Sequence, residues 1–358
     1  MDAQVIASQF TIQSPVVSAK PMGIGNINAS FVVTCEDGSK YALQRINTNI
    51  FKDPKGMMNN IFAVTEHIRN KVASEGGDPD REVLQYLKTA EGETVYETEE
   101  GVYRMYRFVD DVLTIQQVPD AEWAYQCAFA FGRFQKQLSD FDSSVLIETI
   151  PNFHHTQKRY ETFLASVEKD ATGRKEEVAD LIEFAKKESY LASAIVKDVE
   201  AGVLPVRVTH NDTKINNILF NPETKRGMCI IDLDTVMPAT TLYDFGDMVR
   251  TAATVTEEDD ERYDQVGMDL RYFKALVKGY YEGSDGALTR EEIKRFPLSA
   301  KVITYETFLR FLTDYLDGDV YFACRKDRHN LIRATNQMYL LRNMEDHYEQ
   351  MLSVLDEL

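Results

Sequence analysis

Long apolar runs, paired cysteines and an excess of basic residues are all missing from this sequence of 358 residues. No stretch approaches the roughly 18 uninterrupted apolar residues of a membrane helix, so we expect no transmembrane segment. The first residues have no basic region followed by an apolar core, which argues against a secretory signal. The formal charge of −18 repels phosphate groups, so we expect neither nucleic-acid nor membrane partners.

Cysteine is scarce, and the four thiols are far apart in the sequence. Because Cys35, Cys127, Cys229 and Cys324 form no CxxC pair, neither a disulfide framework nor a zinc site is indicated. Reduced thiols are typical of a cytoplasmic protein, which is the localisation we expect.

The composition is that of an ordinary globular protein, with 44% hydrophobic and 27% charged residues. A chain of this length exceeds one simple core and favours two lobes. We found no internal repeat and no low-complexity region. The sequence does not indicate an oligomeric state.

The first hundred residues predict a small sheet with one helix. A short helix is possible within residues 1–20. Residues 31–35 and 40–46 are apolar and β-branched around an Asp-Gly turn, which predicts a hairpin. Residues 57–73 have helical spacing, and two extended pieces follow near 94–96 and 102–108.

The remainder is predicted to be mainly helical. Apolar residues recur at three- and four-residue steps from Trp123 to Phe141, and similar stripes cover 176–199, 265–282 and 298–316. A β-rich island from Val206 to Asp234 interrupts them. The acidic run 257–261 is interpreted as a solvated loop or a helix start.

The island contains the chemically informative residues. Two short apolar runs around a turn at 221–227 predict a hairpin whose open end brings Asn217 beside Asp232. A carboxamide oxygen and a carboxylate at that distance form an oxygen-rich pair suited to Mg²⁺. Asp212 lies on the loop that leads to the same end.

These motifs resemble a known family of kinases. The string THNDTKINNIL (209–219), with DLDTVMP (232–238) and DFGD (244–247), resembles the aminoglycoside-phosphotransferase branch of the protein-kinase-like fold. Together with QRINT (44–48) and DYLDGDVYF (314–322), it is most similar to the bacterial N-acetylhexosamine 1-kinases. The similarity extends over nearly the whole chain.

The resemblance implies an α+β, two-lobed fold and a set of roles. Residues 1–106 would form a small nucleotide-covering lobe, and residues 107–358 a large lobe with the catalytic loop, metal site and acceptor pocket. Asp212 would accept or orient the proton of the attacking hydroxyl. Asn217 and Asp232 would hold Mg²⁺ on the phosphates of ATP. Positioning and charge neutralisation carry most of the rate in such reactions.

Neighbouring polar residues are assigned supporting roles. We expect His210 to brace the catalytic loop rather than to titrate, and Asp247 to support the same loop. Asp244 begins an Asp-Phe-Gly triplet, but it lies beyond the hairpin, so Asp232 is the better metal ligand. For Asp234, a second metal contact and a capping role remain open.

The nucleotide end departs from the usual kinase pattern. Gly23 and Gly25 match a phosphate-covering loop, and Asn28 stands where protein kinases usually carry a third glycine. The usual phosphate-binding lysine would fall at Gln44 or Arg45. Since glutamine carries no charge, either Arg45 reaches the phosphates or metal ions neutralise more of the phosphate charge.

The resemblance also places the adenine and acceptor contacts. The backbone of Arg107 to Val109 would contact adenine where the lobes join. Arg310 and Tyr321 match residues that contact the sugar or the transferred phosphate. Asn26 and Thr251 depart from the histidine and the aromatic residue expected there, which leaves the exact acceptor open.

The sequence therefore predicts an ATP- and Mg²⁺-dependent kinase acting on a small-molecule sugar, at the anomeric hydroxyl of an N-acetylhexosamine or a related hexose. The alternatives are a kinase of an amino alcohol or aminoglycoside, and a nucleotide-binding pseudokinase. A pseudokinase would have lost Asp212, Asn217 or Asp232, and all three are present.

Overall fold

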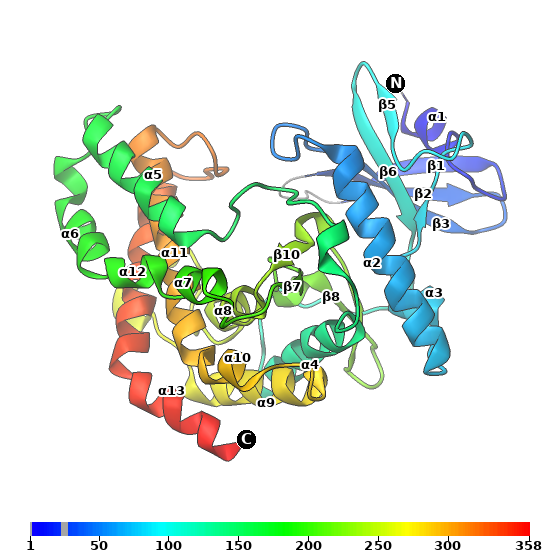
Figure 1. Cartoon of the computed structure of the whole chain (residues 1–358). Helices are drawn as coiled ribbons and strands as arrows, with labels where there is room; N and C mark the ends of the chain where they lie inside the picture. Colours follow the sequence, from blue (N-terminus) through cyan, green and yellow to red (C-terminus); the bar gives the residue numbers. More distant parts are fainter. Residues whose placement is uncertain (1, 23–27) are drawn as a thin grey trace. The chain divides into compact units, whose positions relative to one another are not determined.

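The computed structural model describes residues 2–22 and 28–358 (Figure 1). Contacts divide the chain into two compact units. Unit 1 comprises Met1–Thr114, Asp140–Pro151 and Leu219–Pro238, and unit 2 comprises Ile115–Ser139, Asn152–Ile218 and Ala239–Leu358.

The elements of unit 1 include an N-terminal sheet, the helices beside it and a later hairpin. They are α1 (Ala3–Ala7), β1 (Val16–Pro21), β2 (Ala29–Cys35), β3 (Lys40–Ile46), α2 (Pro54–Ser74), α3 (Pro79–Glu82), β4 (Tyr86–Leu87), β5 (Tyr96–Thr98), β6 (Gly101–Arg107), η1 (Ser143–Val145), β8 (Ile218–Phe220), β9 (Gly227–Ile230), η5 (Leu233–Thr235) and β10 (Met237–Ala239), of which β8 and β10 lie at the edges of the unit.

The predicted small sheet is confirmed. Its strands run in the order β1-β2-β3-β6-β4, with β5 also paired to β6. The predicted helix 57–73 is α2, which begins earlier because Asp53 caps it and Pro54 fits its first turn. The N-terminal helix is only α1; Val16 and Val17 instead enter β1, as expected for β-branched residues.

One face of the sheet carries the apolar core of unit 1. Ile6 and Phe10 pack there against Val33, Leu43 and Met105. Side chains alternate along a strand, so Gln44 of β3 points to the opposite face from Leu43. Helix α2 lies beside the sheet in Figure 1 and contributes Met58 to that opposite face.

The elements of unit 2 are mainly helical, as the sequence predicted. They are α4 (Ala121–Gln137), α5 (Thr156–Lys169), η2 (Glu176–Val178), α6 (Ala179–Lys187), η3 (Ser189–Ser193), α7 (Val196–Glu200), β7 (Arg207–Thr209), η4 (Ile215–Asn217), α8 (Thr241–Ala252), η6 (Tyr263–Gln265), α9 (Leu270–Ser284), α10 (Arg290–Lys294), α11 (Phe296–Asp317), α12 (His329–Asp346), α13 (Tyr348–Val354) and η7 (Leu355–Glu357).

Helix α11 forms the centre of unit 2. It is buried along most of its length and packs against α5, α8 and α12. Helices α4 and α9 approach closely at Gly279, because glycine has no side chain. A Cβ at this position would lie 2.4 Å from the carbonyl oxygen of Tyr125. Among the residues that the structure describes, no helix combines the length and apolarity needed to cross a bilayer.

The predicted hairpin after the catalytic motif is confirmed. Strands β8 and β9 pair in a two-stranded sheet. Phe220 and Leu113 exchange two backbone hydrogen bonds of 2.9 Å, which ties the hairpin into unit 1. Asn217 directly precedes β8, and Asp232 is the second residue after β9.

Candidate active site

The segment from His210 to Lys214 is an irregular loop of unit 2 between β7 and η4. His210 is buried, and its ring meets Phe131 and Phe134 edge-on with centroid separations of 5.3 and 6.2 Å. Its Nδ1 accepts a hydrogen bond from the N–H of Asp212 (3.3 Å). The ring therefore holds the backbone of this loop from the inside of the unit.

Two acidic side chains of α8 accept backbone N–H groups of the same loop. Asp244 accepts from His210 (3.0 Å) and from Asn211 (2.7 Å). Asp247 accepts from Thr213 (3.1 Å). Because residues three apart share a helix face, both carboxylates point at the loop. Helix α8 thus braces the loop through Asp244 as well as through Asp247, for which the sequence predicted such support.

The carboxylate of Asp244 is fully engaged inside unit 2. It is 1% exposed and also accepts from Nε2 of Gln135 (3.2 Å). Burial raises the pKa of Asp244, although His210 and the two N–H donors oppose the rise. This environment suits a structural acid rather than the metal ligand that the Asp-Phe-Gly spelling suggests.

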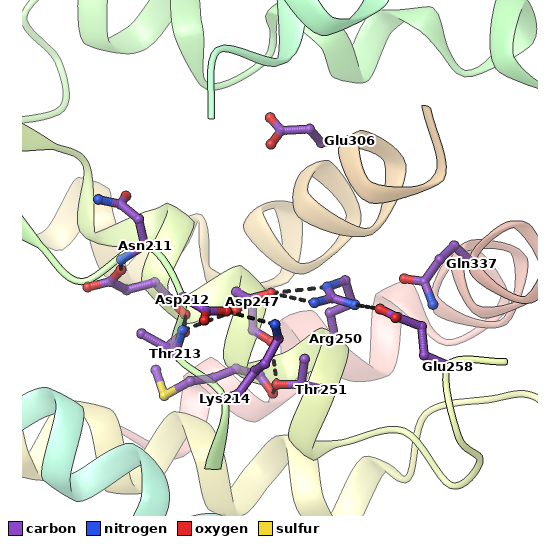
Figure 2. Close-up of polar contacts among 12 residues, drawn as sticks. Asn211, Asp212, Thr213, Lys214, Asp247, Arg250, Thr251, Glu258, Glu306 and Gln337 are labelled. Carbon is purple, nitrogen blue, oxygen red and sulfur yellow. Dashed lines mark hydrogen bonds and ion pairs between the residues drawn. The ribbon is translucent and has the colours of Figure 1, made fainter. Parts of the chain in front are cut away.

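Asp212 lies partly exposed, with 28% of its side chain accessible, and contacts two polar partners. Its Oδ1 is 2.9 Å from Nζ of Lys214, and its Oδ2 accepts from Nδ2 of Asn217 (3.1 Å). Figure 2 shows Asp212 near Thr213, Lys214 and Asp247. Burial alone would raise the pKa of Asp212, but Lys214, His210 and Asn217 together lower it to about 2. The group is therefore a carboxylate at neutral pH.

The carboxamide of Asn217 is oriented by Asp212. Its Nδ2 donates to the backbone oxygen of Asp212 (2.8 Å) and to its carboxylate, so Oδ1 faces away from Asp212. An oxygen of this kind is a ligand type that Mg²⁺ accepts. Asp232 is exposed and has a φ of 59°, which is uncommon outside glycine. That these two residues face each other stays a prediction.

Within residues 2–22 and 28–358, no group of three or more histidine, cysteine, aspartate or glutamate side chains is arranged to hold a metal ion. One carboxylate plus one carboxamide oxygen still fits Mg²⁺, because this ion usually keeps several waters and takes few protein ligands.

Unit 1 holds a buried arginine that the sequence analysis did not assign. Arg104 of β6 lies directly opposite Gln44 of β3 in the ladder, and its Nε donates to Oε1 of Gln44 (2.9 Å). Its Nη1 forms an ion pair with Asp234, whose side chain is 5% exposed. Asp234, left open between metal contact and cap, thus pairs with a buried guanidinium.

Asn28 joins the same network, whereas Gly23, Gly25 and Asn26 lie outside the described residues. Asn28 is buried; its Nδ2 donates to Asp234 (2.7 Å), and its Oδ1 accepts from the N–H of Asn47 (3.0 Å).

Arg45 lies on the other face of β3 from Gln44, because neighbouring residues of a strand alternate. A Cβ added at Gly101 would lie 2.5 Å from its Nε, so the side chain of Arg45 covers this glycine. The structure brings Gln44, but not Arg45, beside Arg104.

Comparison with known proteins decides the family. The sequence profile of the Phosphotransferase enzyme family, abbreviated APH, matches residues 18–275, well over half of the chain. The chain belongs to this phosphotransferase family.

Solved structures share the fold of this phosphotransferase. An aminoglycoside phosphotransferase from Alicyclobacillus acidocaldarius is 13% identical with a TM-score of 0.67, and the match covers 100% of this chain and 97% of that one. A microcompartment-associated aminopropanol kinase is 12% identical, with a TM-score of 0.56 and 98% of each chain covered.

A spectinomycin phosphotransferase, solved with ADP and spectinomycin, is also 12% identical, with a TM-score of 0.57 and with 96% of this chain and 95% of that one covered. Identities this low show the fold alone. The structural matches confirm the predicted kinase-like α+β fold, with a β-rich N-terminal region and a mainly helical C-terminal part.

Lys214 is a second residue of the phosphotransferase that the sequence analysis left without a role. Its proximity to Asp212 raises the pKa of its ammonium group above the usual value, so it is a cation at neutral pH. Its side chain is 43% exposed, so the charge remains accessible. The spacing of two residues from Asp212 was the signal that could have found it.

A chain of ion pairs continues from Asp247 (Figure 2). Arg250 is buried, and its Nη2 lies 2.8 Å from Asp247 while its Nη1 lies 2.6 Å from Glu258. The acidic run 257–261 is therefore not merely solvated. Thr251 donates its hydroxyl hydrogen to the backbone oxygen of Asp247 (2.8 Å), one helical turn earlier.

Arg310 and Tyr321 lie near the C-terminal end of α11. The guanidinium carbon of Arg310 lies 5.1 Å from the ring centroid of Phe153 and 5.4 Å from that of Phe322. The side chain of Tyr321 is 54% exposed.

Nearby, Glu306 accepts from Nδ1 of His154 and from Thr156, both at 2.7 Å. His154 Nε2 lies 3.0 Å from the backbone oxygen of Asn211, which joins this cluster to the loop 210–214. Burial would raise the pKa of Glu306, but His154 and Arg310 contribute to lowering it.

The predicted adenine-contacting segment begins at Arg107, the last residue of β6. The N–H of Arg107 donates to the backbone oxygen of Gln85 (2.9 Å), and the N–H of Phe108 donates to the backbone oxygen of Lys40 (3.0 Å). Within the described ranges, the N–H of Val109 donates to no backbone oxygen.

Proposed function

We propose that the chain is an ATP-dependent kinase that phosphorylates the anomeric hydroxyl of an N-acetylhexosamine or a related hexose. The observation that carries the proposal is the ionised, partly exposed Asp212, held between Lys214 and Asn217 on a loop braced by His210 and α8. A pseudokinase would not require a buried network that holds a solvent-accessible carboxylate in place.

In the proposed reaction, the acceptor hydroxyl oxygen attacks the terminal phosphorus of ATP, and the bond from that phosphorus to the ADP oxygen breaks. Asp212 holds the hydroxyl hydrogen and receives the proton as the new bond forms. Its pKa of about 2 makes it a poor base before the attack, so orientation of the acceptor is its main contribution.

Asn217 and Asp232 would supply oxygen ligands to Mg²⁺, which when bound neutralises charge on the phosphates. Lys214 would place a further positive charge beside the transferred group. Residues 1–106 would cover the nucleotide through Gly23 and Gly25, and the N–H of Val109 would be available to adenine. Residues 107–358 would supply the catalytic loop and the acceptor pocket.

The charges of unit 2 favour a neutral acceptor over an aminoglycoside or an amino alcohol. Three acids in this region already pair with a cation: Asp212 with Lys214 (2.9 Å), and Asp247 and Glu258 with Arg250 (2.8 and 2.6 Å). Arg310 and Arg159 also contribute to the lowered pKa of Glu306. A polycationic acceptor would have to compete with Lys214 and Arg250 for these carboxylates, whereas a sugar requires only hydrogen-bond donors and acceptors.

The four cysteines of the described chain are free thiols, three of them buried. This agrees with a reducing compartment, so we propose a cytoplasmic enzyme.

The test is an ADP-release assay with N-acetylglucosamine, N-acetylgalactosamine, unsubstituted hexoses, aminopropanol, choline and aminoglycosides. We expect turnover on a neutral sugar. The variant Asp212→Asn should lower kcat by about 10²- to 10⁴-fold, the usual contribution of a positioned acid–base group, while ADP still binds.

The matched control is Asp285→Asn, a surface aspartate that is 78% exposed and pairs with Lys136; it should leave kcat unchanged. Turnover only on cationic acceptors would overturn the sugar assignment. Near-normal kcat in Asp212→Asn would overturn the role of Asp212.

A further inference from the structure

A buried ion pair joins the sheet of unit 1 to the turn that follows Asp232. Arg104 and Asp234 are 1% and 5% exposed, and they come from β6 and η5. Desolvation makes such pairs costly, and apolar residues often stabilise a core equally well. A specific arrangement around both charges is therefore a reason to look for a role beyond stability.

The arginine is oriented by the neutral residue opposite it. Gln44 accepts from Nε of Arg104 (2.9 Å), and its own Nε2 donates to the hydroxyl of Ser30 (3.0 Å). The guanidinium also lies 5.8 Å from the centroid of Tyr86, and its Nη1 is 3.9 Å from Sδ of Met58. Gln44 is thus occupied in aligning a cation supplied by the neighbouring strand.

The aspartate connects the arginine to two further segments. One oxygen of Asp234 pairs with Arg104, and the other accepts from Asn28 (2.7 Å). Asn28 in turn accepts from the N–H of Asn47, just after β3. Asp232 immediately precedes η5, which contains Asp234. A single network therefore connects β6, η5 and Asn28, the residue before β2.

The electrostatics agree with a permanent pair. Burial would lower the pKa of Arg104, but Asp234 more than compensates and raises it. The cation is therefore retained inside unit 1.

We propose that Arg104 is a positioning residue for metal-dependent nucleotide binding: it fixes Asp234, and through it the backbone of Asp232 and the side chain of Asn28. This inference rests on the proposed kinase function. Arg104 acts through these residues. It supplies from β6 the positive charge that β3 lacks at Gln44. Lysine would be a poor substitute, since one ammonium cannot match the planar fork that meets Gln44 and Asp234 together.

The experiment compares Arg104→Met with Arg104→Lys and with a control. Binding of ADP is measured by calorimetry with and without Mg²⁺, binding of adenosine is measured alongside, and the melting temperature is recorded without ligand. Because supporting residues around a metal site usually change affinity by about 10- to 100-fold, Arg104→Met should weaken Mg²⁺-dependent ADP binding by that factor. Adenosine binding should not change, and Arg104→Lys should fall between.

The control is Lys301→Met, which removes another buried cation, 2.5 Å from Glu345 in unit 2. It should lower the melting temperature without altering ADP binding. If Arg104→Met behaves like this control, the arginine is only structural and the inference is wrong.

Should Arg104→Met not fold, Gln44→Leu tests the same alignment without removing a charge, and unchanged Mg²⁺-dependent ADP binding in it would overturn the inference. The proposed function fails separately, if the wild-type protein binds no ADP in the presence of Mg²⁺.

Discussion

The carboxylate of Asp212 shows how single side chains set the chemistry of the loop. Two influences on its pKa oppose each other: burial raises it, and Lys214 is the largest of the lowering influences. The sum lies below the ordinary value, so the folded protein favours the ionised form. This contribution to stability is present above the unfolded pKa and is lost as the pH falls towards about 2.

We predict that Lys214→Met moves the acidic limb of the pH profile of kcat/KM to higher pH. Without Lys214, burial dominates and the pKa of Asp212 rises, so protonation inactivates the enzyme at a less acidic pH. The measurement is kcat/KM between about pH 4 and 8.

The matched control for this prediction is Lys187→Met, because Lys187 is 78% exposed, is the last residue of α6 and pairs with Glu188 (3.6 Å). An acidic limb that stays at the wild-type pH in Lys214→Met would contradict the assignment.

At the scale of elements, two helices position candidate residues through carboxylate–backbone bonds. Helix α8 holds the loop 210–214 through Asp244 and Asp247. Helix α11 does the same for the segment after it: Asp314 accepts from the N–H groups of Val320 (2.9 Å), Tyr321 (2.8 Å) and Phe322 (2.9 Å). Asn330 of α12 donates to the same carboxylate (2.8 Å).

We predict that Asp314→Ala raises the KM for the acceptor by about tenfold, equivalent to about 1.4 kcal/mol, with little change in the KM for ATP. Without the carboxylate, three N–H groups lose their acceptor and the segment that carries Tyr321 loosens. Steady-state kinetics with each substrate varied in turn provides the measurement.

Asp120→Ala is the corresponding control, because Asp120 caps α4 through the N–H groups of Glu122 and Trp123. Its loss should cost about 1 kcal/mol of stability and leave the acceptor KM unchanged. An equal effect of both variants on that KM would refute the specific role of Asp314.

At the scale of the whole molecule, the proposed function couples ligand binding to stability. A ligand that binds only the folded chain stabilises it by mass action, by about 2.7 kcal/mol at about 100 times its Kd. We predict that ADP with Mg²⁺ raises the melting temperature and that chelation of the metal reverses most of the rise. Differential scanning calorimetry measures both steps, and a rise independent of Mg²⁺ would argue against Asn217 and Asp232 as metal ligands.

The sequence alone determined the features that depend on neighbouring residues. The hairpin 31–46, the helix around 57–73 and the catalytic segment 210–217 are each encoded within a short stretch. Periodicity, turn residues and motif spacing were therefore sufficient to predict them. The boundary residues were less predictable: a cap such as Asp53 lies outside the apolar pattern of the helix that it starts.

Only the tertiary structure decided which distant polar groups meet. Arg104 reaches Gln44 across 60 residues, and Asp244 reaches His210 across 34. Strand register decides the first contact, and the face that α8 presents decides the second; neither leaves a local pattern. The segment 210–217 could be predicted because its residues are contiguous. The network of Arg104, Gln44, Asp234 and Asn28 could not, because burial of a paired charge depends on segments that meet only after folding.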